Sequence, residues 1–147
     1  MNLAEFMRHR LCGCDLEHWI NAQNIPVLPG AYVIAIDLAR PLQIKLRNRP
    51  SEALPAGRYL YCGSAKGPGG LRARIARHMR RGKPRRWHVD LLTEAGRVLA
   101  AWTIVEGDEC RLIAALACLR TPIDGFGSGV CQTCRSHLLR WSEIAFR

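Results

Sequence analysis

Acidic residues are scarce in this sequence, and one long stretch has none. The chain carries 12 Asp and Glu against 22 Lys and Arg, which gives a formal net charge of +10. No acidic residue stands between Ala53 and Val89, and eight of the basic residues fall within 72–86. A surplus of positive charge indicates the kind of partner rather than the fold, and it favours nucleic acid first and membrane headgroups second.

Long apolar runs and an even cysteine count are missing too. Residues 1–23 carry charges throughout, so the sequence predicts neither a signal peptide nor a membrane span. Seven cysteines in a chain without an export signal argue against a full disulfide framework. We therefore expect a cytoplasmic protein with reduced thiols and no membrane partner.

The chain has the size and composition of one globular domain. It has 147 residues, of which 48% are apolar, and this is enough to build a hydrophobic core. Helical spacing of apolar residues near the start predicts one or two short helices within 3–20. We expect residues 1–29 to form an N-terminal helical extension and residues 30–147 to form the main domain.

Alternating apolar residues predict most of a small sheet. Residues 31–38 are apolar on both faces, which is typical of an inner strand. Residues 42–46 alternate apolar and polar side chains, which predicts a half-exposed antiparallel edge strand. With residues 59–62 they would form a three-strand meander, separated from the last strand by a loop over 48–57. Residues 98–105 predict a central strand.

The helix predicted over 71–81 separates the basic residues into two groups. Leu71, Ile75 and Met79 form a narrow apolar stripe at 100° per residue. Arg74 and His78 lie along one edge of this stripe, where the helix would meet the sheet. The other basic side chains of this helix are expected to face solvent.

Further helices complete an α+β domain. Pro84 can start a second helix, and Gly96 can end it. Asp108 is a suitable N-cap for a third helix that runs to about Leu119. A strand or a short helix is expected around 138–141. The fold class is therefore α+β, with a small and mostly antiparallel sheet flanked by helices.

Five residues could carry chemistry, although each has an ordinary structural interpretation. A strand tyrosine is usually a core residue, and an arginine or histidine on a basic helix is usually solvated or hydrogen-bonded in the core. Glu109 is harder to dismiss, because it lies on the buried stripe of its helix, where an unpaired charge is costly. The five candidates are Tyr32, Tyr61, Arg74, His78 and Glu109.

Together these residues follow a known order. Gly30-Ala31-Tyr32 and Tyr61-Cys62-Gly63 resemble the paired motif of the GIY-YIG nuclease superfamily. The resemblance continues with Leu71, Arg74 and His78 on the first helix, and with Glu109, Leu112 and Ile113 at the start of the third. Further segments are similar to a small single-domain branch that is sometimes fused to DNA-repair enzymes: Tyr61 to Ala65, Gly69 to Leu71, Trp87 to Asp90, Glu109-Cys110, Phe126 to Ser128 and Ser136 to Leu138.

The resemblance implies a GIY-YIG-like fold and an endonuclease that hydrolyses phosphodiester bonds in DNA, in repair or restriction, with one Mg²⁺ or Mn²⁺. It implies that Glu109 holds the metal and that Arg74 stabilises charge on the phosphate. Tyr32 would activate or orient the attacking water, Tyr61 would assist, and His78 would relay or position a proton. The alternative is a nucleic-acid-binding module of the same fold without catalysis.

The basic stretch supplies candidate contacts to nucleic acid, with DNA favoured over RNA. Glycines 67, 69 and 70 lead into a helix N-terminus, whose backbone N–H groups can bind phosphate. The candidate basic contacts are Lys66, Arg72, Arg77, Arg80, Arg81, Lys83, Arg85 and Arg86.

A second metal site is an open alternative near the end of the chain. Cys131, Cys134 and His137 have the spacing C-x₂-C-x₂-H, and Cys110 or Cys118 could complete a structural zinc site. The short spacing leaves no obvious fourth ligand, so the sequence favours reduced thiols over zinc. His88 and Asp90 belong to the resemblance without a derived role; helix capping or core bonding is the alternative for both.

Overall fold

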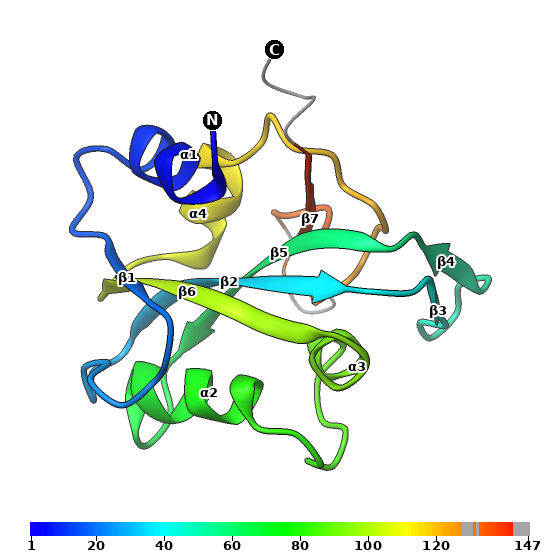
Figure 1. The fold of residues 1–147 in the computed structure, drawn as a ribbon, viewed down its shortest axis with the longest axis horizontal. Helices are drawn as coiled ribbons and strands as arrows, with labels where there is room; N and C mark the ends of the chain where they lie inside the picture. The colour runs from blue at the N-terminus through cyan, green and yellow to red at the C-terminus, as the bar shows by residue number, and fades with distance from the viewer. Residues whose placement is uncertain (128–130, 132, 143–147) are drawn as a thin grey trace.

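A five-stranded sheet lies between two layers of helices in the computed structural model of the chain (Figure 1), which describes residues 1–127, 131 and 133–142. The strand order is β1-β6-β2-β5-β7, and all neighbouring strands run antiparallel. These strands are β1 (Glu17–Trp19), β2 (Gly30–Leu38), β5 (Gly57–Ala65), β6 (Arg97–Val105) and β7 (Leu138–Trp141).

Each face of the sheet is covered by two helices. On one side lie α2 (Gly70–Met79) and α3 (Val89–Ala95), and on the other lie α1 (Leu3–Arg10) and α4 (Glu109–Ala115). A separate two-stranded sheet, β3 (Leu42–Ile44) with β4 (Glu52–Leu54), projects beside them (Figure 1). The predicted α+β class with a mostly antiparallel sheet is confirmed.

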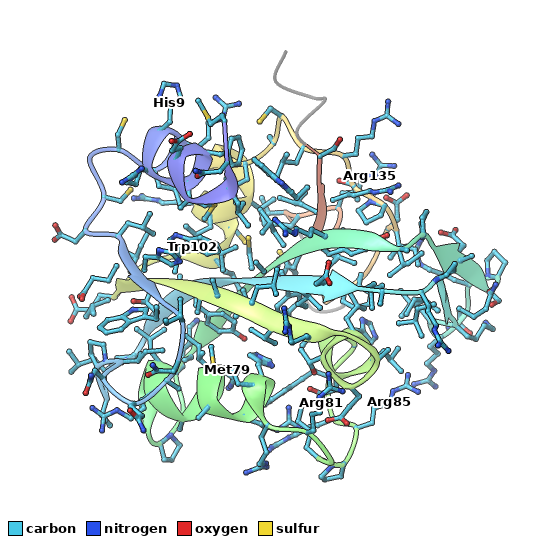
Figure 2. All side chains as sticks on the ribbon, viewed as in Figure 1. His9, Met79, Arg81, Arg85, Trp102 and Arg135 are labelled. Atoms are coloured by element: carbon cyan, nitrogen blue, oxygen red, sulfur yellow. The ribbon has the colours of Figure 1, made fainter. Side chains whose placement is uncertain are left out.

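Strand β2 is the centre of the fold because both of its faces are buried. Tyr32, Ile34 and Ile36 belong to the core under α2 and α3. The alternate residues Ala31 and Val33 belong to the second core, under α1 and α4. This two-sided burial is what a continuously apolar strand predicts. Trp102 of β6 lies in the second core, between the sheet and α4 (Figure 2).

The predicted three-strand meander is wrong in its middle strand. Residues 42–44 do form a strand, but it pairs with β4, within the stretch predicted as loop. The cause is that both edges of β2 are already occupied, by β5 and β6 along its whole length. The inserted segment therefore pairs with itself and packs Ile44 and Leu54 against the first core.

The N-terminal segment is not only helical. Residues 17–19, predicted within a helix, form the edge strand β1 and pair with β6. The indole N–H of Trp19 donates to Thr103 Oγ1 at 2.9 Å, which ties the segment to the sheet. Phe6 and Met7 of α1 are buried in the second core. Residues 1–29 therefore contribute both a strand and core side chains.

Several element ends differ from the sequence prediction. Helix α3 begins at Val89 rather than Pro84, because the Asp90 carboxylate accepts the backbone N–H groups of Arg86 and Trp87 and holds them in a turn. The Asp108 side chain caps α4 as predicted, but the helix ends at Ala115. Residues 138–141 form a strand. Ser128 of the motif and the end of the chain from residue 143 lie outside the described residues.

Candidate active site

Three of the five predicted residues meet on the α2 side of the sheet. Tyr32 and Tyr61 lie on the paired strands β2 and β5, with ring centroids 6.5 Å apart. His78 of α2 lies above them, and its Nε2 is 2.7 Å from the Tyr32 hydroxyl. The ring of His78 is 5.4 Å from that of Tyr32 and 6.3 Å from that of Tyr61. Helix α2 and the two strands thus build one aromatic cluster.

Two glycines make room for these rings. Tyr32 pairs with Gly63 across the sheet, and its ring lies over that bare backbone. A Cβ at Gly63 would lie 2.4 Å from the Tyr32 hydroxyl and 2.5 Å from Cζ, which is far inside van der Waals contact. Gly127 has φ +70°, and a Cβ there would lie 2.8 Å from the Tyr61 ring. The glycine of the second motif is therefore required by the tyrosine of the first.

Arg74 stands between this cluster and the surface. Its Nη1 donates to the carbonyl of Ser64 at 2.9 Å, which fixes the guanidinium at the end of β5. The guanidinium carbon also lies 4.3 Å from the Trp87 ring. The helical angles predicted that Arg74 and His78 face the sheet while Arg72 does not, and Arg72 is exposed and reaches instead to the Ile25 carbonyl.

Burial keeps the cluster uncharged at neutral pH. Burial raises the pKa of Tyr32 well above its usual range, and the nearby Arg74 offsets only part of this effect. Burial also raises the pKa of Tyr61, with a further contribution from the charge of Glu109. Burial lowers the pKa of His78 to about 3. The hydrogen bond between Tyr32 and His78 therefore joins a neutral phenol to a neutral imidazole.

Glu109 approaches the same cluster from the other helix layer. It is the first residue of α4, and its side chain is 29% exposed. Its charge raises the pKa of both tyrosines, so the carboxylate lies within electrostatic reach of their hydroxyl groups. Among the described residues its one ion-pair contact is His137 Nδ1, 3.8 Å from Oε2. A partly exposed carboxylate without a Lys or Arg partner suits a hard cation that keeps several waters.

A basic pocket of about 260 Å³ lies beside Arg74, at the start of α2. Its walls include the glycine-rich turn before α2 and the side chains of Arg74, Arg77, Arg86 and Trp87. The three guanidinium carbons lie 4.3, 4.3 and 5.1 Å from the Trp87 ring. The Trp87 ring therefore holds three guanidinium groups at this pocket through cation–π contacts.

Two predicted nucleic-acid contacts are instead used inside the protein. Arg77 binds Asp90 through two hydrogen bonds, of 2.7 and 3.0 Å. Lys83 has a fully buried side chain and binds Glu94 at 3.0 Å and the Arg80 carbonyl at 2.7 Å. The prediction that Arg77 faces solvent is wrong, because Arg77 has a carboxylate partner on α3. Lys83 likewise has a carboxylate partner on α3.

The remaining six basic residues divide into two groups. Arg72 donates to the Ile25 carbonyl, and Arg81 donates to the carbonyls of Glu94 and Gly96. Arg85 projects from the connection between α2 and α3, with Arg81 close to the end of α3 (Figure 2). Among the described residues, no hydrogen bond or ion pair occupies the side-chain charge of Lys66, Arg80, Arg85 and Arg86.

The N-terminus of α2 does not offer free N–H groups to a phosphate. The N–H groups of Gly70 and Ala73 donate to carbonyls of the glycine turn. Those of Leu71 and Arg72 donate to the carbonyls of Leu28 and Pro26. The prediction that backbone N–H groups of α2 bind phosphate here is wrong, because carbonyls of the glycine turn and of the N-terminal segment already accept them. Any anion at this pocket must be held by side chains.

A second cluster brings together thiols and an imidazole from distant parts of the sequence. Ligand atoms of Cys110, Cys131, Cys134 and His137 all lie within 4.8 Å of one another. Cys118, the alternative fourth ligand, is exposed and does not belong to this group. Three cysteines and one histidine at this spacing can hold a metal ion such as zinc.

The comparisons with known proteins identify a family without an assigned activity. A family model described as domain of unknown function DUF123 matches residues 31–146. The chain belongs to this family. No curated protein and no solved structure matches it. The DUF123 match contains both tyrosines, the basic helix, Glu109 and all four metal-binding candidates.

Within the DUF123 match, the structure gives roles to two residues that the sequence left open. His88 Nδ1 accepts the backbone N–H of Gly127 at 2.9 Å, which holds the loop that covers the Tyr61 ring. Asp90 pairs with Arg77 and caps the turn before α3. Burial raises the pKa of Asp90, but the hydrogen bonds from Arg77 and two backbone N–H groups outweigh it and hold the pKa at about 2. Both residues therefore position the pocket rather than line it.

In the sequence, His88 and Asp90 stand out only as members of the Trp87 to Asp90 motif, which does not indicate what they contact. Trp87 to Asp90 stand together in the sequence, but their partners Gly127 and Arg77 are far away or on another helix.

In the described part of the chain, no helix is both long and apolar enough to span a membrane.

Proposed function

We propose that this protein is a divalent-metal-dependent endonuclease of the GIY-YIG type that hydrolyses phosphodiester bonds in DNA. The observation that carries the proposal is the cluster of Tyr32, Tyr61 and His78 with Arg74 at its edge, which come from two strands and one helix. The charge of Glu109, at the start of α4, reaches both tyrosines. A basic pocket adjoins them and suits a polyanionic substrate. No single residue of this set would support the same conclusion.

Arg74 is the group that would meet the scissile phosphate. It is shared between the aromatic cluster and the basic pocket, and its anchor on the Ser64 carbonyl uses only one of its donors. Positive charge near the equatorial oxygens stabilises the transition state of phosphoryl transfer. Arg86, which also lines this pocket, can hold a neighbouring phosphate.

Tyr32 would orient the attacking water. The raised pKa of its hydroxyl argues against a phenolate base. If the hydroxyl donates its proton to Nε2 of the neutral His78, its oxygen keeps lone pairs that accept a hydrogen bond from water. His78 then fixes the direction of that hydroxyl, and Tyr61 closes the other side of the cluster.

Glu109 would hold the cation. Its carboxylate is partly exposed, has no Lys or Arg partner among the described residues and lies within electrostatic reach of both tyrosines. A bound Mg²⁺ or Mn²⁺ would supply a Lewis acid that stabilises charge on the phosphate and leaving group. With one protein carboxylate, the cation would keep most of its water ligands.

Cleavage of varied DNA substrates, with RNA for comparison, tests the proposal in the presence of Mg²⁺ or Mn²⁺. Arg74→Ala and Glu109→Ala should each lower the cleavage rate by roughly 10²-fold or more, as expected when a transition-state contact is lost. Arg8→Ala and Glu52→Ala are matched controls, because both side chains are exposed and lie outside the cluster and the basic stretch. Cleavage that persists unchanged in both site variants would refute the assignment.

A DNA-binding module without catalysis is the second candidate. It is favoured by one observation: the basic pocket is not lined by either tyrosine or by Glu109. The pocket could therefore bind phosphates without the rest of the site. This function predicts salt-dependent binding that Arg74→Ala weakens, Glu109→Ala leaves unchanged, and no divalent cation converts into cleavage.

A further inference from the structure

The segment between α4 and β7 is long and contains little regular secondary structure. Residues 116–137 separate the two elements, and their described part contains no helix or strand beyond one isolated bridge, between Arg120 and Arg140. Connections of more than about 15 residues without secondary structure are uncommon in compact domains. The strand that follows, β7, is four residues long and lies at the sheet edge. Buried side chains such as Leu116 and Phe126 and backbone hydrogen bonds hold parts of this segment, and a bound ion would add a further link.

The cysteine cluster joins the start of α4 to the last part of this segment. Cys110 lies in the first turn of α4, whereas Cys131 and Cys134 lie in the loop, and His137 immediately precedes β7. We propose that Cys110, Cys131, Cys134 and His137 bind one zinc ion, which fastens the first turn of α4 to the segment leading into β7. A link that closes so long a loop removes conformational freedom from the unfolded chain.

The spacing of the ligand atoms fits tetrahedral zinc. With Zn–S bonds of about 2.3 Å, two thiolates of a tetrahedral site lie about 3.8 Å apart. The sulfur atoms of Cys110 and Cys131 are 3.6 Å apart, and the whole ligand set falls within 4.8 Å. The backbone N–H of Cys134 donates to Cys131 Sγ at 3.3 Å, which is a bond that stabilises a thiolate.

His137 supplies independent evidence for a ligand. Its side chain is 3% exposed, yet Nε2 has no hydrogen-bond partner among the described residues. An unpaired buried nitrogen is costly, and coordination of a metal removes that cost. Its other nitrogen, Nδ1, lies 3.8 Å from Glu109 Oε2. Zinc-bound histidines commonly direct their second nitrogen to a carboxylate, so this arrangement is the expected outer shell of a zinc site.

The proposed zinc site also explains where Glu109 points. Glu109 and Cys110 are consecutive residues, so fixing Cys110 fixes the start of the helix that carries the carboxylate. Oε2 faces His137, which leaves Oε1 without a partner in the described part of the chain. The ion would therefore be structural, because four protein ligands leave no open coordination position for a substrate.

Metal analysis of the full chain tests the site without reference to nuclease activity. The protein is purified under reducing conditions without a histidine tag, and its zinc is measured by mass spectrometry. We expect about one zinc per chain, a fall to background in Cys131→Ser, and no change in Cys118→Ser, whose exposed thiol lies outside the cluster. Replacement of the zinc by Co²⁺ should give the charge-transfer and ligand-field absorption of a tetrahedral thiolate site.

The wild-type measurements keep the proposal falsifiable even if Cys131→Ser does not fold. A folded, reduced wild-type chain that contains no zinc and takes up no tetrahedral Co²⁺ would overturn it. A disulfide between Cys110 and Cys131 in place of metal would overturn it too. Zinc that Cys118→Ser removes as completely as Cys131→Ser would show that the ligands are assigned wrongly. None of these outcomes depends on whether the protein cleaves DNA.

Discussion

At the residue scale, the closest packing in the candidate site is between a ring and a glycine. The Tyr32 ring lies over Gly63, where a Cβ would come within 2.4 Å of the hydroxyl oxygen and 2.5 Å of Cζ. The ring cannot move away freely, because its hydroxyl is bonded to the buried His78. The second motif therefore needs a glycine at position 63, because the tyrosine of the first motif packs against it across the paired strands.

Replacing this glycine should destabilise the protein. We expect Gly63→Ala to lower the free energy of unfolding by about 1–3 kcal/mol, because one added methyl group overpacks the Tyr32 ring. Urea unfolding followed by tryptophan fluorescence measures the effect. Gly67→Ala is the matched control: its Cβ would have no neighbour within 4 Å, so a change within about 0.5 kcal/mol is expected. Equal effects of the two substitutions would contradict the packing argument.

His78 should make the free energy of unfolding depend on pH, in a range above that in which most carboxylates titrate. Burial lowers its pKa to about 3, whereas an unfolded histidine has a pKa of about 6.5. Above that value both states hold the imidazole neutral, and the stabilisation is complete. As the pH falls below about 6.5, the unfolded state binds the proton more readily, so stability is lost towards the folded pKa.

The expected loss is about 2 kcal/mol between pH 8 and pH 5, which is the free energy of protonating His78 only in the unfolded state. It should disappear in His78→Gln, whose amide can still reach the Tyr32 hydroxyl but does not titrate. The difference between the wild type and this variant isolates His78, because His18 and His88, whose pKa values are also lowered, remain in both proteins. His9→Gln, at an exposed position of α1, is the control and should keep the full pH dependence (Figure 2). A wild-type slope retained in His78→Gln would contradict the role of burial.

At the scale of elements, the sequence predicts what depends on its own periodicity. The two-sided burial of β2 and the faces of α2 that carry Arg74 and His78 follow from local spacing, and the structure agrees. Pairing partners do not follow from spacing. Of the alternating residues 42–46, only 42–44 form a strand. This strand, β3, pairs with β4 because β5 and β6 already occupy the edges of β2.

The same limit explains the errors and omissions in the candidate site. The sequence predicts that Arg77 faces solvent and that Lys83 contacts nucleic acid, because it does not show that Asp90 and Glu94 lie opposite them. The metal-binding cluster was underestimated for the same reason: Cys110 is 21 residues from Cys131, and only the packing of α4 beside the segment before β7 brings them together. The sequence predicts the elements, but only the structure shows which side chains of different elements contact each other.

At the scale of the whole molecule, the count of 22 Lys and Arg residues overstates the positive charge that is available to a partner. In the basic stretch, Arg77 and Lys83 are neutralised by carboxylates, and Arg72 and Arg81 donate to backbone carbonyls. The other four candidates, with Arg74 at the pocket, form the part of the stretch that can meet phosphates. These residues lie on the side of the sheet covered by α2 and α3, whereas α1 and α4 cover the opposite side (Figure 1).

This distribution predicts how DNA affinity should vary with salt. Each phosphate neutralised by a side chain contributes about 0.9 to the negative slope of log K against log salt concentration. Removing two available charges, in Arg80→Ala with Arg85→Ala, should therefore reduce the slope by about 2. Fluorescence anisotropy with a labelled duplex at several salt concentrations measures it.

The control removes the same net charge from the opposite side of the sheet. Arg8 and Arg111 are exposed residues of α1 and α4, so Arg8→Ala with Arg111→Ala should leave the slope nearly unchanged. Equal reductions in the two double variants would mean that DNA responds to the total charge and not to a particular surface, and the interface beside α2 would then be wrong. A reduction confined to the first pair would assign the polyanion to the same side of the sheet as Arg74, because at a Debye length of about 8 Å charges on the far side of the sheet are largely screened from the DNA.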